Sequence, residues 1–398
     1  MNRDDGLRSP TLETGVTSQK ERIARIIEAY DAQGWHRTAT DVDLRSARWL
    51  AQQVRECGLE PTLEPFAVSR IDPQSCYLEV DGERVVGLPL FDGTFTHPEG
   101  IRGSLGPLGS NAAVALAAVG AGGQVQEFEK ARRDGRHQAI VAVTLGGRPG
   151  LAARNAPAFK EPFGPPVLQV GSDVRDWLTE RAARGSDCHL VVAASRTGAE
   201  AFNVVATLRG SVPSLAPLVI TTPRSGWWHC AGERGGGIAC WLECIRLLSQ
   251  SQHERDIQFA AFSGHELGFM GVDAFTAGRP GLERRASVWL HFGASIGAAQ
   301  DARLRFSAHD EALEQLVREA LGAEGVTDVP ATPLGTAVGG ESVVVHERGG
   351  RVVAMVGFGH ALFHLEADRW PEAVDLDLVG RFARAFSGLA LRLAGAPG

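Results

Sequence analysis

The sequence lacks any long apolar run. No stretch approaches the roughly 18 apolar residues of a membrane-spanning helix, and the opening residues MNRDDGLRSPTLETG have no apolar core of the kind that a secretory signal needs. We therefore expect a cytoplasmic protein that has no membrane partner.

A basic surface is missing as well. The chain carries 40 Lys and Arg against 47 Asp and Glu, a net charge of −7, so we expect no nucleic-acid partner. The six cysteines are scattered rather than spaced as a disulfide framework, which suits a reducing compartment. Two of them, Cys240 and Cys244, lie one helical turn apart on an apolar helix face and are expected in the core.

The centre of the chain carries the clearest secondary-structure pattern. Three short apolar runs, Leu218 to Thr222, Ile257 to Phe262 and Val288 to Phe292, are typical of buried strands. A helical pattern from about Gly236 to Gln250 lies between the first two. Strand, helix and strand in this order predict an α/β fold whose mixed, mostly parallel central sheet is flanked by helices.

The 398 residues are enough for two domains, or for one domain with an insertion. Residues 1–70 contain two helix starts, in which Ser18 is followed by Glu21 and Thr40 by Asp43. Residues 71–198 are rich in strands and glycine, and we expect them to form an inserted smaller domain that shapes a pocket. Residues 199–398 then complete the main domain. Within the insertion, AAVGAGGQ does not match a dinucleotide loop, and we expect no strand before it.

Polar side chains follow the central strands where each strand ends. Glu233 follows the first strand, His265 and Glu266 follow the second, and His291 lies in the third. Because the carboxyl ends of parallel strands meet at one edge of the sheet, this edge is the expected ligand site. Imidazole and carboxylate are ligands that zinc, iron and manganese accept. The predicted metal ligands are Glu233, Glu266, His291 and His364.

Four segments resemble a known family in their order and spacing. They are CAGERGGGIACWLECIRLL, FAAFSGHELGFMGVDAF, WLHFGA and FHLEADRWPEAVD. They are similar to the loop-and-helix, the second strand, the third strand and the closing motif of the co-catalytic zinc aminopeptidases, a family that also contains glutaminyl cyclases. The resemblance implies that family's fold and a metal-dependent hydrolase, with residues 71–198 in the position of its protease-associated domain.

The departures from the family pattern change the expected site. The family's His-x-Asp motif falls on residues 223–225, Pro-Arg-Ser, so one ligand of the second metal is missing. The bridging aspartate falls on Glu233, the general-base glutamate on His265 and the third-strand aspartate on His291, whereas Glu266 and His364 keep the family's ligand types. The resemblance therefore implies one divalent ion, zinc before iron or manganese, on Glu233, His291 and His364, with Glu266 as a fourth ligand or behind them.

Two further residues receive catalytic roles. His265 is the candidate proton carrier, because imidazole titrates near neutral pH. Arg224 holds a substrate carboxylate or a developing oxyanion, or else is a surface charge. Since a metal-bound water can attack a polarised carbonyl, the sequence favours a hydrolase that cleaves an amide or related C–N bond of a small molecule.

Three alternatives are weighed against this interpretation. Residues 293–297 fit the G-x-S-x-G motif of serine hydrolases around Ser295, but a strand rather than a helix is expected to follow. The set His291, His364 and Glu266 has the composition of a non-haem iron triad. The third alternative is a binding protein that kept the fold and lost catalysis. Homo-oligomer formation is left open.

Overall fold

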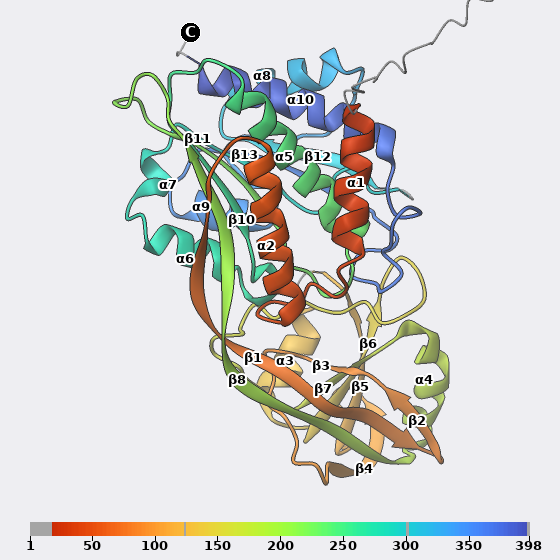
Figure 1. Ribbon diagram of the computed structural model, residues 1–398. Coiled ribbons are helices and arrows are strands. Elements are labelled where there is room, and N and C mark those ends of the chain that lie inside the picture. The colour runs from red at the N-terminus through yellow and green to blue at the C-terminus, as the bar shows by residue number, and fades with distance from the viewer. Residues whose placement is uncertain (1–17, 123–124, 300–301, 396–398) are drawn as a thin grey trace, which may run out of the picture.

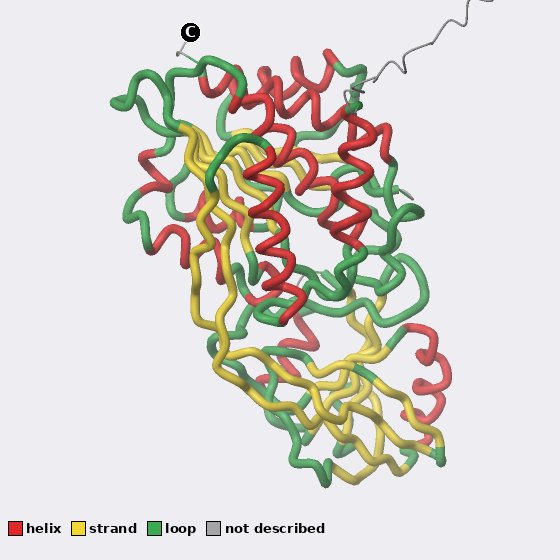
Figure 2. Tube along the Cα trace, in the orientation of Figure 1, coloured by secondary structure: helices red, strands yellow, loops and turns green. Residues whose placement is uncertain are grey.

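The computed structural model describes residues 18–122, 125–299 and 302–395, which form two lobes (Figure 1). The larger lobe has a central sheet surrounded by helices, whereas the smaller lobe is mostly strand (Figure 2). Within these ranges, no helix has the length and apolar character needed to cross a membrane.

The sheet of the larger lobe confirms the predicted fold class. Its strands run in the order β12-β13-β11-β9-β10-β8, and the four in the middle are parallel. The edge strand β12 is antiparallel to β13, and β8 is antiparallel to β10. The bounds are β9 Leu218–Pro223, β10 Ile257–Phe262, β11 Val288–Phe292, β12 Arg303–Ala308 and β13 Val352–Phe358. The strands β9, β10 and β11 lie where the sequence predicts them.

Helices cover both faces of this sheet, which explains why its central strands are apolar on both sides. Along β9, for example, Leu218 and Ile220 pack with the helices of one face and Val219 with those of the other. The first face carries α1 Gln19–Asp31, α2 Asp41–Glu56, α5 Gly236–Ser249, α8 Glu311–Ala323 and α10 Leu376–Ala394. The second carries α6 Met270–Ala277, α7 Leu282–Arg285 and α9 Glu341–Glu347. The predicted caps at Ser18 and Thr40 start α1 and α2.

Two long antiparallel strands, β1 Pro61–Val80 and β8 Asp187–Leu208, run from one lobe into the other. Ile71 and Ala201 belong to the core of the larger lobe, whereas Cys76 and Val192 belong to a separate core in the smaller lobe. The predicted boundaries at residues 71 and 198 lie within these strands, where one core gives way to the next.

The smaller lobe contains a parallel strand–helix–strand unit that the sequence did not predict. Strand β5 runs directly into Ala121 and Gly122, so the expectation that no strand precedes this segment is wrong. The elements of this lobe are β2 Glu83–Val86, β3 Leu88–Pro89, β4 Ile101–Pro107, β5 Val114–Gly120, α3 Gln126–Asp134, β6 Ala139–Leu145, β7 Val167–Val170 and α4 Arg175–Arg184.

Candidate active site

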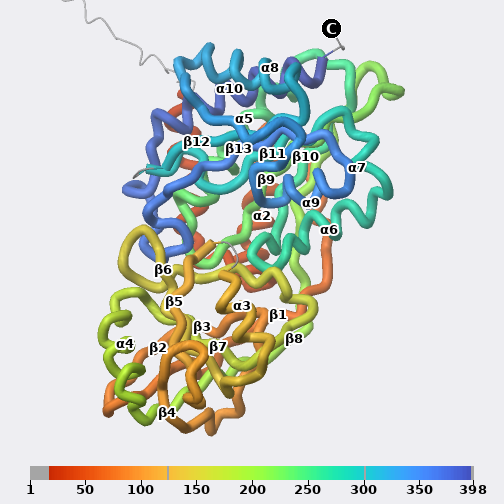
Figure 3. Tube along the Cα trace, turned by 180° about the vertical axis from the view of Figure 1, so that it is seen from behind, coloured from red at the N-terminus to blue at the C-terminus, as the bar shows by residue number. Residues whose placement is uncertain are grey.

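The parallel strands of the larger lobe end at the junction with the smaller lobe, and β5 and β6 end at the same junction from the other side (Figure 3). After β9 the chain enters α5 through a π-helical turn, Ala231–Gly235, which carries Glu233 and Arg234. This turn packs so closely that a Cβ atom on Gly236 would lie 1.7 Å from the carbonyl oxygen of Ile296. Glycine at this position lets α5 start directly beneath the strand ends.

A cavity of about 750 Å³ lies at this junction, and its size is in the usual range for small-molecule sites. His265, His360 and His364 line it from the larger lobe, and the segments 121–122 and 145–147 line it from the smaller lobe. The described lining residues include several glycines and apolar side chains but no Lys, Arg, Asp or Glu. The cavity therefore offers imidazole groups and apolar surface rather than fixed charge.

His265 forms a pair with Glu341 at the wall of this cavity. Its Nδ1 lies 3.0 Å from the Glu341 Oε1, and because an ionised carboxylate only accepts, Nδ1 donates and Nε2 is left to accept a proton. Although burial raises the pKa of Glu341, His265 and His291 lower it to about 2. Glu341 is thus a fixed anion behind His265 at neutral pH.

His291 lies on the other side of Glu341. Its Nε2 is 3.4 Å from the Glu341 Oε2, and its Nδ1 is 2.9 Å from the Thr221 hydroxyl. Burial lowers the pKa of His291 to about 4, with Glu341 opposing the shift only in part. The ring is therefore neutral at pH 7.

Glu233 and Glu266 lie on either side of an arginine. The Arg234 Nη2 is 2.9 Å from the Glu233 Oε1 and 2.8 Å from the Glu266 Oε1. Burial opposes the charge on Glu233 and Arg234, but the two glutamates hold the pKa of Arg234 above its ordinary value, and Arg234 with His364 holds the pKa of Glu233 below its own. Ser225 completes the group, since its hydroxyl donates to the Glu266 Oε2 at 2.7 Å.

His364 and His360 share one arrangement. Each Nδ1 faces a backbone carbonyl, at 2.6 Å from Ala153 for His364 and at 3.3 Å from Ala299 for His360. A carbonyl only accepts, so Nδ1 carries the proton and Nε2 of the neutral ring presents a lone pair. That lone pair faces a carboxylate oxygen at 3.4 Å, from Glu233 and Asp368 respectively. Two acceptors face each other in each pair, which calls for a proton or a cation between them.

Residues 153–156 of the insertion, which lie between β6 and β7 and pack against the core of the larger lobe, supply groups that hold the site in place. Besides its contact with the His364 ring, Ala153 donates its N–H to the His364 carbonyl at 3.1 Å. Ala156 donates to the Glu266 carbonyl at 2.7 Å, and the Asn155 side chain accepts from the Trp227 indole at 3.0 Å. The insertion therefore positions the site residues in addition to shaping the pocket.

The structure does not gather the four predicted ligands around one point. It brings Glu233 and His364 together, but Arg234 lies between Glu233 and Glu266, and His291 pairs with Glu341. Among the described His, Cys, Asp and Glu side chains, the one group with ligand atoms within 4.8 Å of one another is Cys230, Glu233 and Asp368. A non-haem iron triad would need His291, His364 and Glu266 around one ion. The structure argues against it, because these three side chains have different partners.

Arg224 does not have the predicted catalytic position. Its side chain is fully buried, and its Nη1 donates to the Asp43 Oδ1 at 2.8 Å and to the Asp43 carbonyl at 3.0 Å. The Ser263 hydroxyl donates to the same carboxylate at 3.0 Å. The guanidinium thus ties α2 to the strand ends and does not line the cavity, so the predicted contact with a substrate is wrong.

Four residues of the site were missed by sequence reasoning: Arg234, Glu341, His360 and Asp368. His360 and Asp368 lie four residues before and after His364, a spacing that could have singled them out. Arg234 is a charged residue beside Glu233 in an otherwise Gly-rich helix start, which is also a usable signal. Glu341 follows the loop GTAVGG, whose sequence gives no sign that it folds back onto β11.

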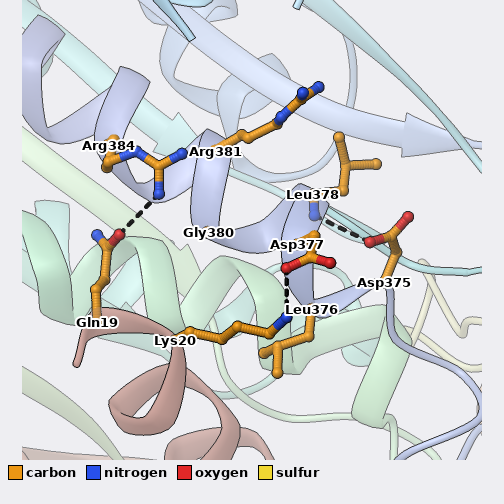
Figure 4. Close-up of a pocket in the computed structure, with 9 residues that line it drawn as sticks. All are labelled: Gln19, Lys20, Asp375, Leu376, Asp377, Leu378, Gly380, Arg381 and Arg384. Carbon is orange, nitrogen blue, oxygen red and sulfur yellow. Dashed lines mark hydrogen bonds and ion pairs between the residues drawn. The ribbon is translucent and has the colours of Figure 1, made fainter. Parts of the chain in front are cut away.

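A second hollow, of about 440 Å³, lies between the ends of α1 and α10 (Figure 4). The Lys20 ammonium contacts Asp377 at 2.5 Å, and Arg384 donates to the Gln19 side chain at 3.1 Å. Its described lining has no histidine or cysteine, and Lys20 and Asp377 are well exposed. Exposed ion pairs of this kind are typical of a solvated surface, so the cavity between the lobes is the candidate active site.

Comparison with known proteins identifies the family that the chain resembles. Residues 211–390 match the model of Peptidase family M28. This confirms the family resemblance, and the matched segment holds all six predicted site residues. The M28 match supports a hydrolase of the peptidase class. No curated protein matches the chain.

Solved structures that resemble the chain include BSAP, a zinc aminopeptidase from Bacillus subtilis, with a TM-score of 0.72, 17% identity and coverage of 94% of this chain and 93% of that one. The aminopeptidase from Aneurinibacillus sp. strain AM-1 gives 0.69 at 16% identity, covering 95% and 94%. A Fimbriiglobus ruber glutaminyl cyclase gives 0.53 at 12% identity, covering 97% and 99%. At these identities the likeness shows the M28 fold alone, across both lobes.

Proposed function

We propose that this chain is a hydrolase that cleaves an amide or related C–N bond of a small, uncharged molecule, with one divalent metal ion in its site. The observation that carries the proposal is the His265–Glu341 pair at the wall of the cavity between the lobes. The M28 match supports the reaction class.

Of the four predicted metal ligands, two have atoms that fit a single ion. The Glu233 Oε2 and the His364 Nε2 are buried and have no hydrogen-bond partner among the described residues, and the Glu233 Oε1, which faces this Nε2, has its ion pair with Arg234. A carbonyl contact on Nδ1, as His364 has, is the usual support for a metal-binding imidazole. Glu233 and His364 would hold the ion, whereas Glu266 and His291 are committed to Arg234, Ser225, Thr221 and Glu341. Nitrogen and oxygen ligands suit zinc, with iron and manganese as alternatives.

When bound, such an ion polarises a carbonyl and acidifies water. The chain's own contribution is proton transfer. The His265 Nε2 accepts a proton from the attacking water, and Glu341 stabilises the imidazolium that forms. As the C–N bond breaks, His265 returns this proton to the leaving nitrogen. Phe269 packs edge-on against the ring at 5.1 Å between centroids, which helps to fix its orientation.

The cavity supports a neutral substrate. An aminopeptidase must accommodate a charged α-ammonium group, and the described lining has no Asp or Glu to bind one. Its apolar side chains include Phe269, Phe358 and Phe363. N-acyl compounds, lactams and simple aromatic amides therefore fit better than free amino-acid amides.

Four single variants test this proposal: His265→Ala, His364→Ala, His291→Ala and His97→Ala, the last changing an exposed histidine of the smaller lobe. Each is assayed for zinc content and for turnover of neutral amides. We expect His265→Ala to keep zinc and lose about 10²- to 10⁴-fold in turnover. His364→Ala should lose zinc, and His291→Ala and His97→Ala should keep it. Zinc retention by His364→Ala, or full turnover by His265→Ala, contradicts the assignment.

A further inference from the structure

We infer that the guanidinium of Arg234 takes the place of a divalent cation between Glu233 and Glu266, which excludes a metal ion from that position. The number of metal ions per chain, which we take as one, rests on the proposed function. The role inferred for Arg234 does not depend on that function.

The geometry is that of a bridging cation. A single nitrogen, the Arg234 Nη2, contacts one oxygen of each carboxylate at 2.9 and 2.8 Å. All three side chains are almost completely buried, with exposed fractions of 0% for Arg234, 1% for Glu233 and 3% for Glu266. Two buried carboxylates this close to one another need a shared positive charge, because burial penalises unpaired anions.

Arg234 is held in this position by a further contact. Its Nε donates to the Ser225 carbonyl at 2.7 Å, while the Ser225 hydroxyl donates to Glu266. The guanidinium is therefore anchored on the loop after β9, and it cannot withdraw to admit an ion without losing that bond. Arginine also keeps its charge at any pH at which the protein is folded. A metal ion at this point would face a permanent positive charge at contact distance.

The inference changes what Glu233 offers to a metal. One oxygen of Glu233 contacts Arg234, and the same oxygen is the one that faces His364 at 3.4 Å. An ion can therefore use Glu233 only on the side away from Glu266. Two residues to which the family resemblance assigns metal binding are thus the two partners of an arginine, and of the two only Glu233 keeps an oxygen, Oε2, without a partner among the described residues.

Zinc titration of Arg234→Ala tests the inference, with Arg234→Lys as the variant that retains the charge. A third variant, Arg132→Met, removes another buried arginine, which pairs with Asp92 in the smaller lobe at 2.8 Å. Calorimetry gives the number of zinc ions bound, and thermal unfolding with and without zinc gives the stabilisation. We expect Arg234→Ala to bind one more zinc ion than the unchanged protein and to gain zinc-dependent thermal stability. Arg234→Lys and Arg132→Met should show neither gain. An Arg234→Ala protein that is folded but binds no additional zinc overturns the inference.

Crystals of the unchanged protein soaked in zinc provide a second measurement, which does not depend on the folding of any variant. We expect no anomalous zinc peak between the carboxylates of Glu233 and Glu266, and a peak there refutes the role of Arg234. A peak missing beside His364 counts against the proposed function and leaves the inference about Arg234 intact.

Discussion

Two buried arginines, Arg224 and Arg234, lie within eleven residues after the end of β9, and they contact different parts of the molecule. Arg224 points toward α2 and pairs with Asp43, whereas Arg234 points between two glutamates of the site. The sequence shows that both are arginines near a strand end. It does not show their direction, because Asp43 lies 181 residues from Arg224 and the pairing depends on how α2 docks.

Replacing Arg224 should affect stability first. We expect Arg224→Met to lower the free energy of unfolding by about 3–5 kcal/mol, because it leaves the Asp43 carboxylate buried without its cation. Urea denaturation measures this loss, with the exposed Arg175→Met as control. An unchanged stability together with a raised KM would instead restore the substrate-binding role.

The serine route makes a separate prediction. Ser295 has a left-handed backbone with φ of 58° and lines the cavity, as a nucleophile can. However, no described histidine donates to or accepts from its hydroxyl, and the described residues 296–299 do not form the helix that a nucleophile elbow requires. We expect Ser295→Ala to keep turnover within about twofold, since nothing activates this hydroxyl. A loss of a hundredfold or more in kcat would establish the serine as the nucleophile.

At the scale of elements, the sequence predicts the scaffold better than the loops. The strands β9, β10 and β11 and the helix α5 lie close to their predicted positions because apolar periodicity reports burial directly. The loops that carry the site depend on special backbone angles, such as the left-handed φ of 62° at His364, which no local pattern announces. Glu341 was missed for this reason, since α9 begins right after a glycine-rich loop.

The contact between α6 and the smaller lobe gives a pH-dependent prediction. Burial opposes the charge of Asp273, but Lys160, at 2.7 Å, and Arg348 hold its pKa below the ordinary value. The stabilisation that comes from a lowered folded pKa is fully present above the unfolded value of about 3.9, and it is lost as the pH falls from there through the folded value. We expect Asp273→Asn to cost up to about 1 kcal/mol at pH 7, because the pair is partly exposed, and less at about pH 3, below the unfolded value. Urea unfolding at both pH values checks this, with Asp176→Asn on α4 as control; an equal cost at both values would contradict it.

On the scale of the whole molecule, the site belongs to both lobes. The sequence predicts an insertion that shapes a pocket, but not that Ala153 holds the His364 ring across a separation of 211 residues. Ala153 lies between β6 and β7 in the sequence but packs in the core of the larger lobe, so this contact depends on how the chain returns from the smaller lobe. Composition and periodicity predict which residues are buried in each core. They do not predict which residues meet between the lobes.

The paired strands β1 and β8 join these cores, and the chain enters and leaves the smaller lobe through them. Their register shifts between Pro73 and Ser75, near the place where one core ends and the other begins. Opposite walls of the cavity are thus carried by two separately packed bodies, which the backbone contacts of Ala153 with His364 and of Ala156 with Glu266 also tie together. The width of the cavity is consequently set by the bend of the β1–β8 ribbon together with those contacts, and a change in either alters the room available to a substrate.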